Sequence, residues 1–320
     1  MSFLITNPIS QYVINWTKQH SFLGFAGIPL YDIITTFRNG VTQDQLVMRA
    51  GSLTFNFMMA LFPTIIFLFT LLPFIPVDNL DDRILDFLLL PKNANHFVND
   101  TIHDLVRRPH GGLLSTGFFL ALFFSSNGIM SMQRAFDKTG YHEAFISRKG
   151  WQKRINALGV MSVLIFLFIL ALIFIVGGAI LVSYVGKMDY VSNFSFILLI
   201  LIRWIALIIL FYAVITILYR YVPSMNRRFP FWSGGAVVGT LLSLVTSYGF
   251  SYFVNNFGAY NKVYGAVGTI IVLMAWFNLN AQVLLIGYEI NISIMNIRKR
   301  SELKKGVEGE ERLEEMAEER

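Results

Sequence analysis

Two histidines and one aspartate stand at the spacing that metal ligands take on a helix. His96, Asp100 and His103 follow one another at intervals of four and three residues, which would place them on one helical face. Pro109 would end such a helix before the next histidine, His110. The polar face of a surface helix shows the same pattern, and two histidines with one aspartate are weak evidence for a metal site. We therefore expect no metal and no other cofactor.

Other groups that enzymes use are missing from the sequence. The 320 residues include no cysteine, which excludes disulfides, iron–sulfur clusters, thiolate zinc sites and cysteine nucleophiles. No His-x-His or Asp-x-Asp pair is present to hold the cations of a metal-dependent nuclease. A glycine-rich loop of the Walker type for nucleotide phosphates is also missing. We expect a protein that is not an enzyme and does not bind nucleic acid.

Five of the polar side chains that lie within apolar runs long enough to cross a membrane stand out. We take them as candidates for lining a substrate cavity: Asn56, Asn127, Arg203, Asn278 and Gln282. Arg203 could reach outward along its own helix, or it could face a polar cavity and meet an anionic head group. For the amide side chains, hydrogen bonds between helices are the ordinary alternative.

Glu289 lies near the end of the last apolar run, and its depth decides which cation it can meet. Arg49, Arg134 and Arg220 are at a suitable depth, whereas Arg203 is too far along the membrane normal. A structural ion pair with one of these three arginines is our preferred interpretation. A protonation or coupling site for transport is the alternative.

Helical angles divide the polar residues of the last run into two stripes. Asn278, Gln282 and Glu289 fall within about 40° of one another at 100° per residue, and Asn280 and Asn291 fall on the opposite side. A helix that is polar on two sides should have protein or water on both. We therefore expect the last run to be a central helix of the bundle.

Basic and aromatic side chains alternate in the link "RYVPSMNRRFPFW". Arg227, Arg228 and Trp232 are suited to contact anionic phospholipid head groups at the membrane boundary. Ordinary anchorage that sets the topology is the alternative. The run that follows carries a small residue at every fourth position: Gly235, Gly239, Ser243, Ser247 and Ser251. This stripe is typical of a tight seam between helices, with a sliding or cavity-lining helix as the alternative.

The composition indicates the elements that must position these residues. Hydrophobic residues make up 55% of the chain and charged residues 14%, whereas a soluble domain is about a quarter charged. Continuous apolar runs indicate helices rather than barrel strands. We expect an all-α polytopic membrane protein, a bundle of six transmembrane helices. The runs are Leu53–Phe74, Leu113–Met132, Ile155–Val185, Phe194–Tyr219, Phe231–Val254 and Gly268–Met295.

Basic residues are concentrated on one side of this bundle. The region before the first run, the second and fourth links and the tail hold 19 of the 26 lysines and arginines. The positive-inside rule then places both termini in the cytoplasm. We expect interfacial N-terminal helices in residues 1–52, a transmembrane domain in residues 53–295 with an external helical link at about 75–112, and a charged cytoplasmic tail in residues 296–320.

Three phrases carry a resemblance to a known family. They are "MRAGSLTFNFMMALFPTIIFL", "LYRYVPSMNRRFPFWSGGAVVGTLLS" and "YGAVGTIIVLMAWFNLNAQVLLIGYEIN". Over about residues 30–298 the chain resembles the YihY/BrkB family of bacterial inner-membrane proteins. That family was once labelled ribonuclease BN, a label generally considered mistaken, and its members are linked to serum resistance and to lipid movement or homeostasis. The resemblance implies a multi-pass protein of the bacterial cytoplasmic membrane.

These observations lead to one main expectation about function and two alternatives. We expect a protein that transports or flips a lipid or other amphiphile, or that supports lipid homeostasis, with membrane phospholipids as its partners. The alternatives are a secondary transporter or channel for a small solute or ion, and a membrane scaffold that transports nothing. The sequence leaves open whether the protein forms a homo-oligomer and which proteins it binds.

Overall fold

The computed structural model is built from helices. It describes residues 8–21, 24–25, 27–43, 46–71, 111–138, 145–146, 148–185, 193–256 and 259–318. Over these residues the helices are α1 (Pro8–Gln19), α2 (Leu30–Gln43), α3 (Leu46–Leu71), α6 (Gly111–Asp137), α7 (Gly150–Val185), α8 (Asn193–Tyr221), α9 (Gly234–Asn256) and α10 (Ala259–Glu318). The expected all-α fold is confirmed. Residues 72–110, which hold His96, Asp100 and His103, lie outside the described part.

Five of the described helices are long and apolar enough to cross a membrane. The segments are Leu46–Phe67 in α3, Gly150–Gly178 in α7, Ile197–Tyr221 in α8, Gly234–Val254 in α9 and Gly268–Lys305 in α10. Helix α6 has 27 residues and covers the second predicted run, but it is not among these five. The protein is polytopic, while the count of six spans stays a prediction.

Helix α3 begins at Leu46, earlier than the predicted start of the first run at Leu53. Hydropathy places the start too late because Arg49 interrupts the apolar pattern. In the folded chain that arginine is buried against two other helices, so the helix extends past it.

Helix α9 begins at Gly234 rather than at Phe231, and its first N–H groups have partners. Gly234 N donates to the carbonyl of Gly24 at 3.0 Å, and Gly235 N donates to Oδ1 of Asn291 at 2.8 Å. Gly24 has a φ of 93°, a conformation that glycine adopts without strain. The N-terminal segment and α10 together cap α9.

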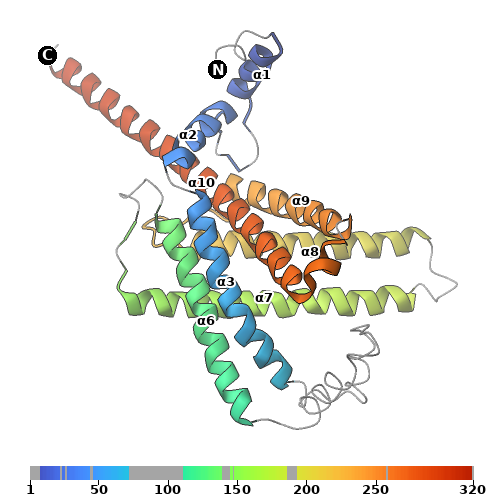
Figure 1. Cartoon of the computed structure of the whole chain (residues 1–320). Helices are drawn as coiled ribbons and strands as arrows, with labels where there is room; N and C mark the ends of the chain where they lie inside the picture. Colours follow the sequence, from blue (N-terminus) through green and yellow to red (C-terminus); the bar gives the residue numbers. More distant parts are fainter. Residues whose placement is uncertain are drawn as a thin grey trace.

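The six long helices of the described part form a ring in which each packs on the next, in the order α7, α8, α9, α10, α3, α6 and back to α7. Helix α6 therefore belongs to the bundle. Helix α2 packs on α10, and α1 packs on α2. In Figure 1 the pair α3–α6 and the pair α7–α8 run in clearly different directions.

The hydrophobic core lies at one end of the ring, where α3, α7 and α9 begin and α6 and α8 end; we call this the core end. Several aromatic rings meet there. Phe136 stacks on Tyr288 with ring centroids 4.1 Å apart, and the ring of Tyr219 lies 5.9 Å from each of them. The helix pairs diverge away from this end (Figure 1).

The stripe of small residues on α9 packs against α10. A Cβ atom on Gly235 would overlap the carbonyl oxygen of Gly287, and a Cβ atom on Gly239 would come within 2.6 Å of the Tyr219 hydroxyl. Ser251, at the far end of the stripe, is exposed. A four-residue interval rotates by about 40° per step, so the stripe turns away from α10. The start of the stripe is a tight helix–helix seam.

Helix α10 has 60 residues, which makes it about 90 Å long. A bilayer core is only about 30 Å thick. The last part of α10 extends away from the bundle toward the C-terminus (Figure 1). The segment is charged, with i,i+4 ion pairs between Arg298 and Glu302 and between Lys304 and Glu308. Residues 296–318 thus continue the last span as one helix.

Candidate functional site

A groove of about 760 Å³ lies between α3, α9 and α10. Its lining residues are Gly51, Thr54, Phe55, Thr246, Gly249, Phe250, Phe253, Met274, Ala275, Asn278 and Leu279. All of them belong to segments that can cross a membrane. Phe55 is 61% exposed, so the groove is open at the bundle surface. Because the lining residues belong to membrane-crossing segments, we expect this opening to face lipid.

Small residues on all three helices leave room for the groove. Cβ atoms on Gly51 and Gly249 would meet nothing within 4 Å, and Ala275 lines the α10 side. Phenylalanine side chains form much of the remaining wall. The result is an apolar cleft of the size that binds small molecules, about 300–1,000 Å³.

A short chain of polar side chains begins at Thr54 and Asn278 on the wall of the groove and continues to Gln282, which does not line it. Asn278 Nδ2 donates to Thr54 Oγ1 at 3.3 Å, and Gln282 Nε2 donates to Asn278 Oδ1 at 2.6 Å. An amide side chain has two donors and two acceptor lone pairs. These contacts use one donor and one lone pair of Asn278, so it can also hydrogen-bond a ligand. The structure thus brings together Asn278 and Gln282, two of the five cavity candidates.

Arg203 lies away from the groove, between α7 and α8. Its Nη2 donates to the carbonyl of Ile175 at 3.0 Å. Its side chain crosses Gly178, where a Cβ atom would come within 3.0 Å of the Arg203 Cδ. The arginine therefore reaches across to the neighbouring helix rather than outward along its own.

Asn56 joins α3 to α6. Its Nδ2 donates to Ser131 Oγ at 3.1 Å and to the carbonyl of Ser52 at 2.8 Å. Ser52 and Ser131 also contact each other at 3.5 Å. These bonds hold two helices together, and Asn56 is not among the groove residues.

Asn127 belongs to a second polar junction, between α6 and α7. Arg154 donates from Nη2 to Asn127 Oδ1 and from Nη1 to Ser126 Oγ, both at 2.9 Å. Its guanidinium also lies 4.8 Å from the ring of Phe123. Sequence reasoning treated Arg154 only as a charge that sets topology. The polar pair Ser126–Asn127 in an apolar run was the available sign that a donor lies nearby.

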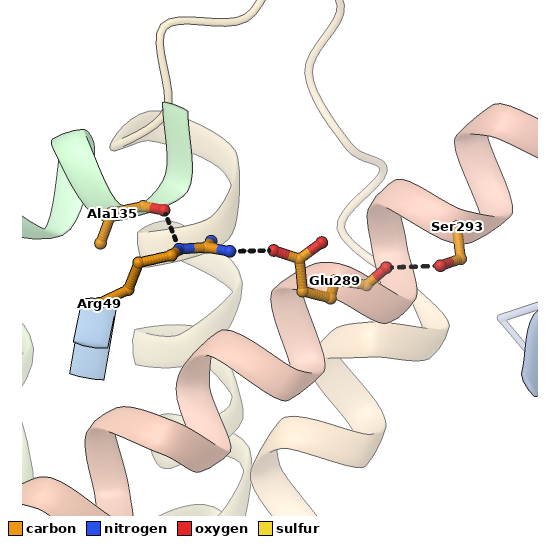
Figure 2. A network of polar contacts seen from close by, with 4 residues as sticks. All are labelled: Arg49, Ala135, Glu289 and Ser293. Atoms are coloured by element: carbon orange, nitrogen blue, oxygen red, sulfur yellow. Dashed lines mark hydrogen bonds and ion pairs between the residues drawn. The ribbon is translucent and has the colours of Figure 1, made fainter. Parts of the chain in front are cut away.

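Glu289 forms an ion pair with Arg49, one of its three candidate partners. Glu289 Oε1 lies 2.7 Å from Arg49 Nη1, and each side chain is only 4% exposed. Arg49 Nε also donates to the carbonyl of Ala135 at 2.8 Å, and Ser293 Oγ donates to the carbonyl of Glu289 (Figure 2). The pair joins α3, α6 and α10 at the core end.

The other two arginines lie elsewhere. Arg134 is exposed near the end of α6. Arg220 donates from Nη1 to the carbonyl of Phe229, and its guanidinium lies 4.3 Å from the ring of Phe231. Arg220 thus holds the link that follows α8 against the end of that helix.

The proposed head-group rim is exposed. Arg227 and Arg228 are both exposed, and the guanidinium of Arg228 lies 4.8 Å from the ring of Tyr221. Trp232 is 72% exposed and packs on Tyr212 with ring centroids 5.5 Å apart. Lipid contact by these residues stays a prediction.

Asp137, at the end of α6, is a titratable group that was not among the predicted site residues. Its Oδ1 accepts a hydrogen bond from Ser224 N at 2.9 Å, and Gln133 donates to Ser224 Oγ at 2.6 Å. Burial raises the pKa of Asp137, while the bond from Ser224 and the charges of Lys153 and Arg148 oppose the shift.

The structure does not test the weak metal-ligand pattern of His96, Asp100 and His103, because these residues lie outside the described ranges. Within those ranges, no three His, Asp or Glu side chains are grouped so that they could hold a metal ion.

Comparison with known proteins gives a family and several relatives. The profile described as virulence factor BrkB matches residues 37–311. The Bacillus subtilis (strain 168) protein YfkH, whose name describes it as ribonuclease-like, is 29% identical over 258 residues, which cover 79% of this chain and 90% of that protein. A UPF0761 membrane protein of Histophilus somni is 22% identical over 268 residues, 80% of this chain and 88% of the relative.

A further UPF0761 membrane protein, from Idiomarina loihiensis, is 31% identical over 107 residues, 33% of this chain and 36% of the relative. No solved structure shows a significant match to the chain. The family description and the UPF0761 names state no enzymatic activity. The profile match includes α3 and α6–α9 and most of α10. The chain therefore belongs to the virulence factor BrkB family of integral membrane proteins.

Proposed function

We propose that the protein binds a lipid or a similar amphiphile in the groove between α3, α9 and α10 and moves it within the membrane. One observation carries this proposal: an apolar groove within membrane-crossing segments contains a polar group at Asn278. An amphiphile has the same two parts. Its chain would pack against Phe55, Phe250 and Phe253, and its polar part would reach Asn278 and Thr54.

The polar chain gives the groove a direction. Asn278, Gln282 and Glu289 share one face of α10, and the buried Arg49–Glu289 pair closes that face at the core end. A ligand would therefore enter from the lipid side and meet hydrogen-bonding groups before it met the closed core. We propose a structural role for Glu289, because its partner is buried with it.

We further propose that the protein lies in the bacterial cytoplasmic membrane with both termini in the cytoplasm. The distribution of basic residues favours a cytoplasmic position for both termini, and the family resemblance favours the bacterial cytoplasmic membrane. In that orientation the core end faces the cytoplasm. The groove would then give access from the bilayer to a bundle that is closed on its cytoplasmic side.

The test is lipid translocation in proteoliposomes that contain a fluorescent phospholipid, with dithionite added outside to quench exposed label. We compare the wild type with Asn278→Leu and with Asn280→Leu. Asn280 is a matched control because it is on the same helix and does not line the groove. Its side-chain Nδ2 donates to the backbone carbonyl of Trp276 within α10. Losing a ligand hydrogen bond of ordinary strength should slow translocation by about tenfold in Asn278→Leu.

The control variant should keep the wild-type rate. If the wild type moves no lipid faster than protein-free liposomes in any composition, the transport proposal is wrong. If both asparagine variants behave as the wild type does, lipid does not pass along Asn278, and the groove loses its proposed role.

A further inference from the structure

We propose that Arg203 is a second lipid site, separate from the groove, which binds the phosphate group of a phospholipid between α7 and α8. Arg203 lies inside the membrane-crossing segment Ile197–Tyr221. Among the described residues, Arg203 forms no ion pair with a carboxylate, and the ion pairs found there involve other side chains. An arginine always carries its charge in a protein. That charge within a span costs at least a few kcal/mol unless something compensates it.

The guanidinium has unused hydrogen-bonding capacity. An arginine has five N–H donors, and among the described residues Arg203 has one hydrogen-bond acceptor, the carbonyl of Ile175. Its Nε is buried and has no hydrogen-bond partner there. A phosphate fits this need because its oxygens accept two parallel hydrogen bonds from a guanidinium.

The level of Arg203 in the bilayer favours a lipid as the source of the phosphate. Arg203 follows the start of α8 by about ten residues, and Ile175 precedes the end of α7 by about ten, so both lie about 15 Å from those helix ends. The guanidinium does not extend toward them, because it crosses the space that Gly178 leaves open. The adjacent Ile202 and Trp204 are more than half exposed. In a bilayer these two exposed apolar side chains would place lipid beside the partly buried arginine.

This inference does not rest on the groove, which lies between α3, α9 and α10 and does not include Arg203. The pair α7–α8 would therefore bind lipid independently of the groove. A phosphate held at this depth would lie below the ordinary head-group level, so α7 and α8 would draw the head group of a phospholipid deeper into the bilayer.

Native mass spectrometry of the full chain in a neutral detergent tests the site with three probes: phosphatidylglycerol, diacylglycerol with the same acyl chains, and inorganic phosphate. We compare the wild type with Arg203→Gln, Arg203→Lys, Gly178→Ala and Arg300→Gln. Arg300 is the matched control, since it is an exposed arginine in the charged end of α10, outside both the α7–α8 contact and the proposed head-group rim. Arg203→Gln should weaken phosphatidylglycerol binding by about tenfold or more. Arg203→Lys should give an intermediate loss, because an ammonium cannot form the bidentate contact.

Gly178→Ala keeps the charge but pushes against the Arg203 side chain, so it should also weaken phosphatidylglycerol binding. This variant and Arg203→Lys keep the test decisive if Arg203→Gln does not fold. Diacylglycerol binding should be the same in all variants. Equal phosphatidylglycerol affinity in the wild type and the Arg203 and Gly178 variants would overturn the proposal. Arg203-dependent binding of inorganic phosphate as tight as that of phosphatidylglycerol would overturn its lipid form.

Discussion

Replacing Glu289 by glutamine should strongly destabilise the protein. The pair is nearly inaccessible to solvent, with both side chains 4% exposed and 2.7 Å between Arg49 Nη1 and Glu289 Oε1. Unit charges about 4 Å apart attract by about 4 kcal/mol at an effective dielectric constant near 20. Removing one charge also leaves the other buried, for which measured costs are about 3–5 kcal/mol. We expect that loss for Glu289→Gln and a similar one for Arg49→Gln.

A double-mutant cycle separates this pair from its surroundings. Replacing both residues by apolar ones, Arg49→Met with Glu289→Leu, leaves no unpaired charge. The double variant should therefore lose much less stability than the sum of the losses in Arg49→Met alone and Glu289→Leu alone. The measurement is denaturant-induced unfolding of the purified protein in a mild detergent. Additive losses would refute the pairing, as would a Glu289→Gln protein as stable as the wild type. A stable Glu289→Gln protein without lipid translocation would instead favour the coupling role of Glu289.

Two further changes test the packing and the electrostatics of the core end. Gly235→Ala should prevent the close approach of α9 to Gly287 and lower the free energy of unfolding by about 1–3 kcal/mol. Gly249→Ala, on the same helix but in open space, should leave the melting temperature in detergent nearly unchanged. Equal effects of the two changes would contradict the tight seam between α9 and α10. Burial raises the pKa of Asp137 above 3.8, so the folded protein binds more protons than the unfolded chain between 3.8 and the raised pKa, and stability should fall as pH rises through that interval. Asp137→Asn should flatten this fall, which melting curves between pH 3.5 and 7 would show, and an unchanged pH profile would contradict the assignment.

The membrane fold could be predicted because lipid imposes one rule on the whole chain. Backbone polar groups in hydrocarbon must be paired within a helix, so long apolar runs became α3, α7, α8, α9 and α10. The two polar stripes of the last run correspond to contacts with two different helices. Asn278 and Glu289 face α3, and Asn291 faces the start of α9. Helix α10 therefore has polar contacts with helices on two sides, but the prediction of a central helix is wrong, because α10 is a member of the ring and exposes apolar residues such as Met274.

The groove and the surroundings of Arg203 could not be predicted in the same way. A groove depends on the directions in which three helices diverge, and no single run contains that information. Depth along one helix showed that Arg203 was unusual, but not that Gly178 of α7 would leave space for it. Arg154 was missed for a related reason, since its partners Ser126 and Asn127 belong to another helix.

A cryo-EM map of the protein in a nanodisc of bacterial lipids would test the central claim most directly. Our account predicts an elongated density between α3, α9 and α10, with its polar end within hydrogen-bond distance of Asn278. A map in which side chains close this groove, or in which it is open and contains no ordered lipid, would contradict the account.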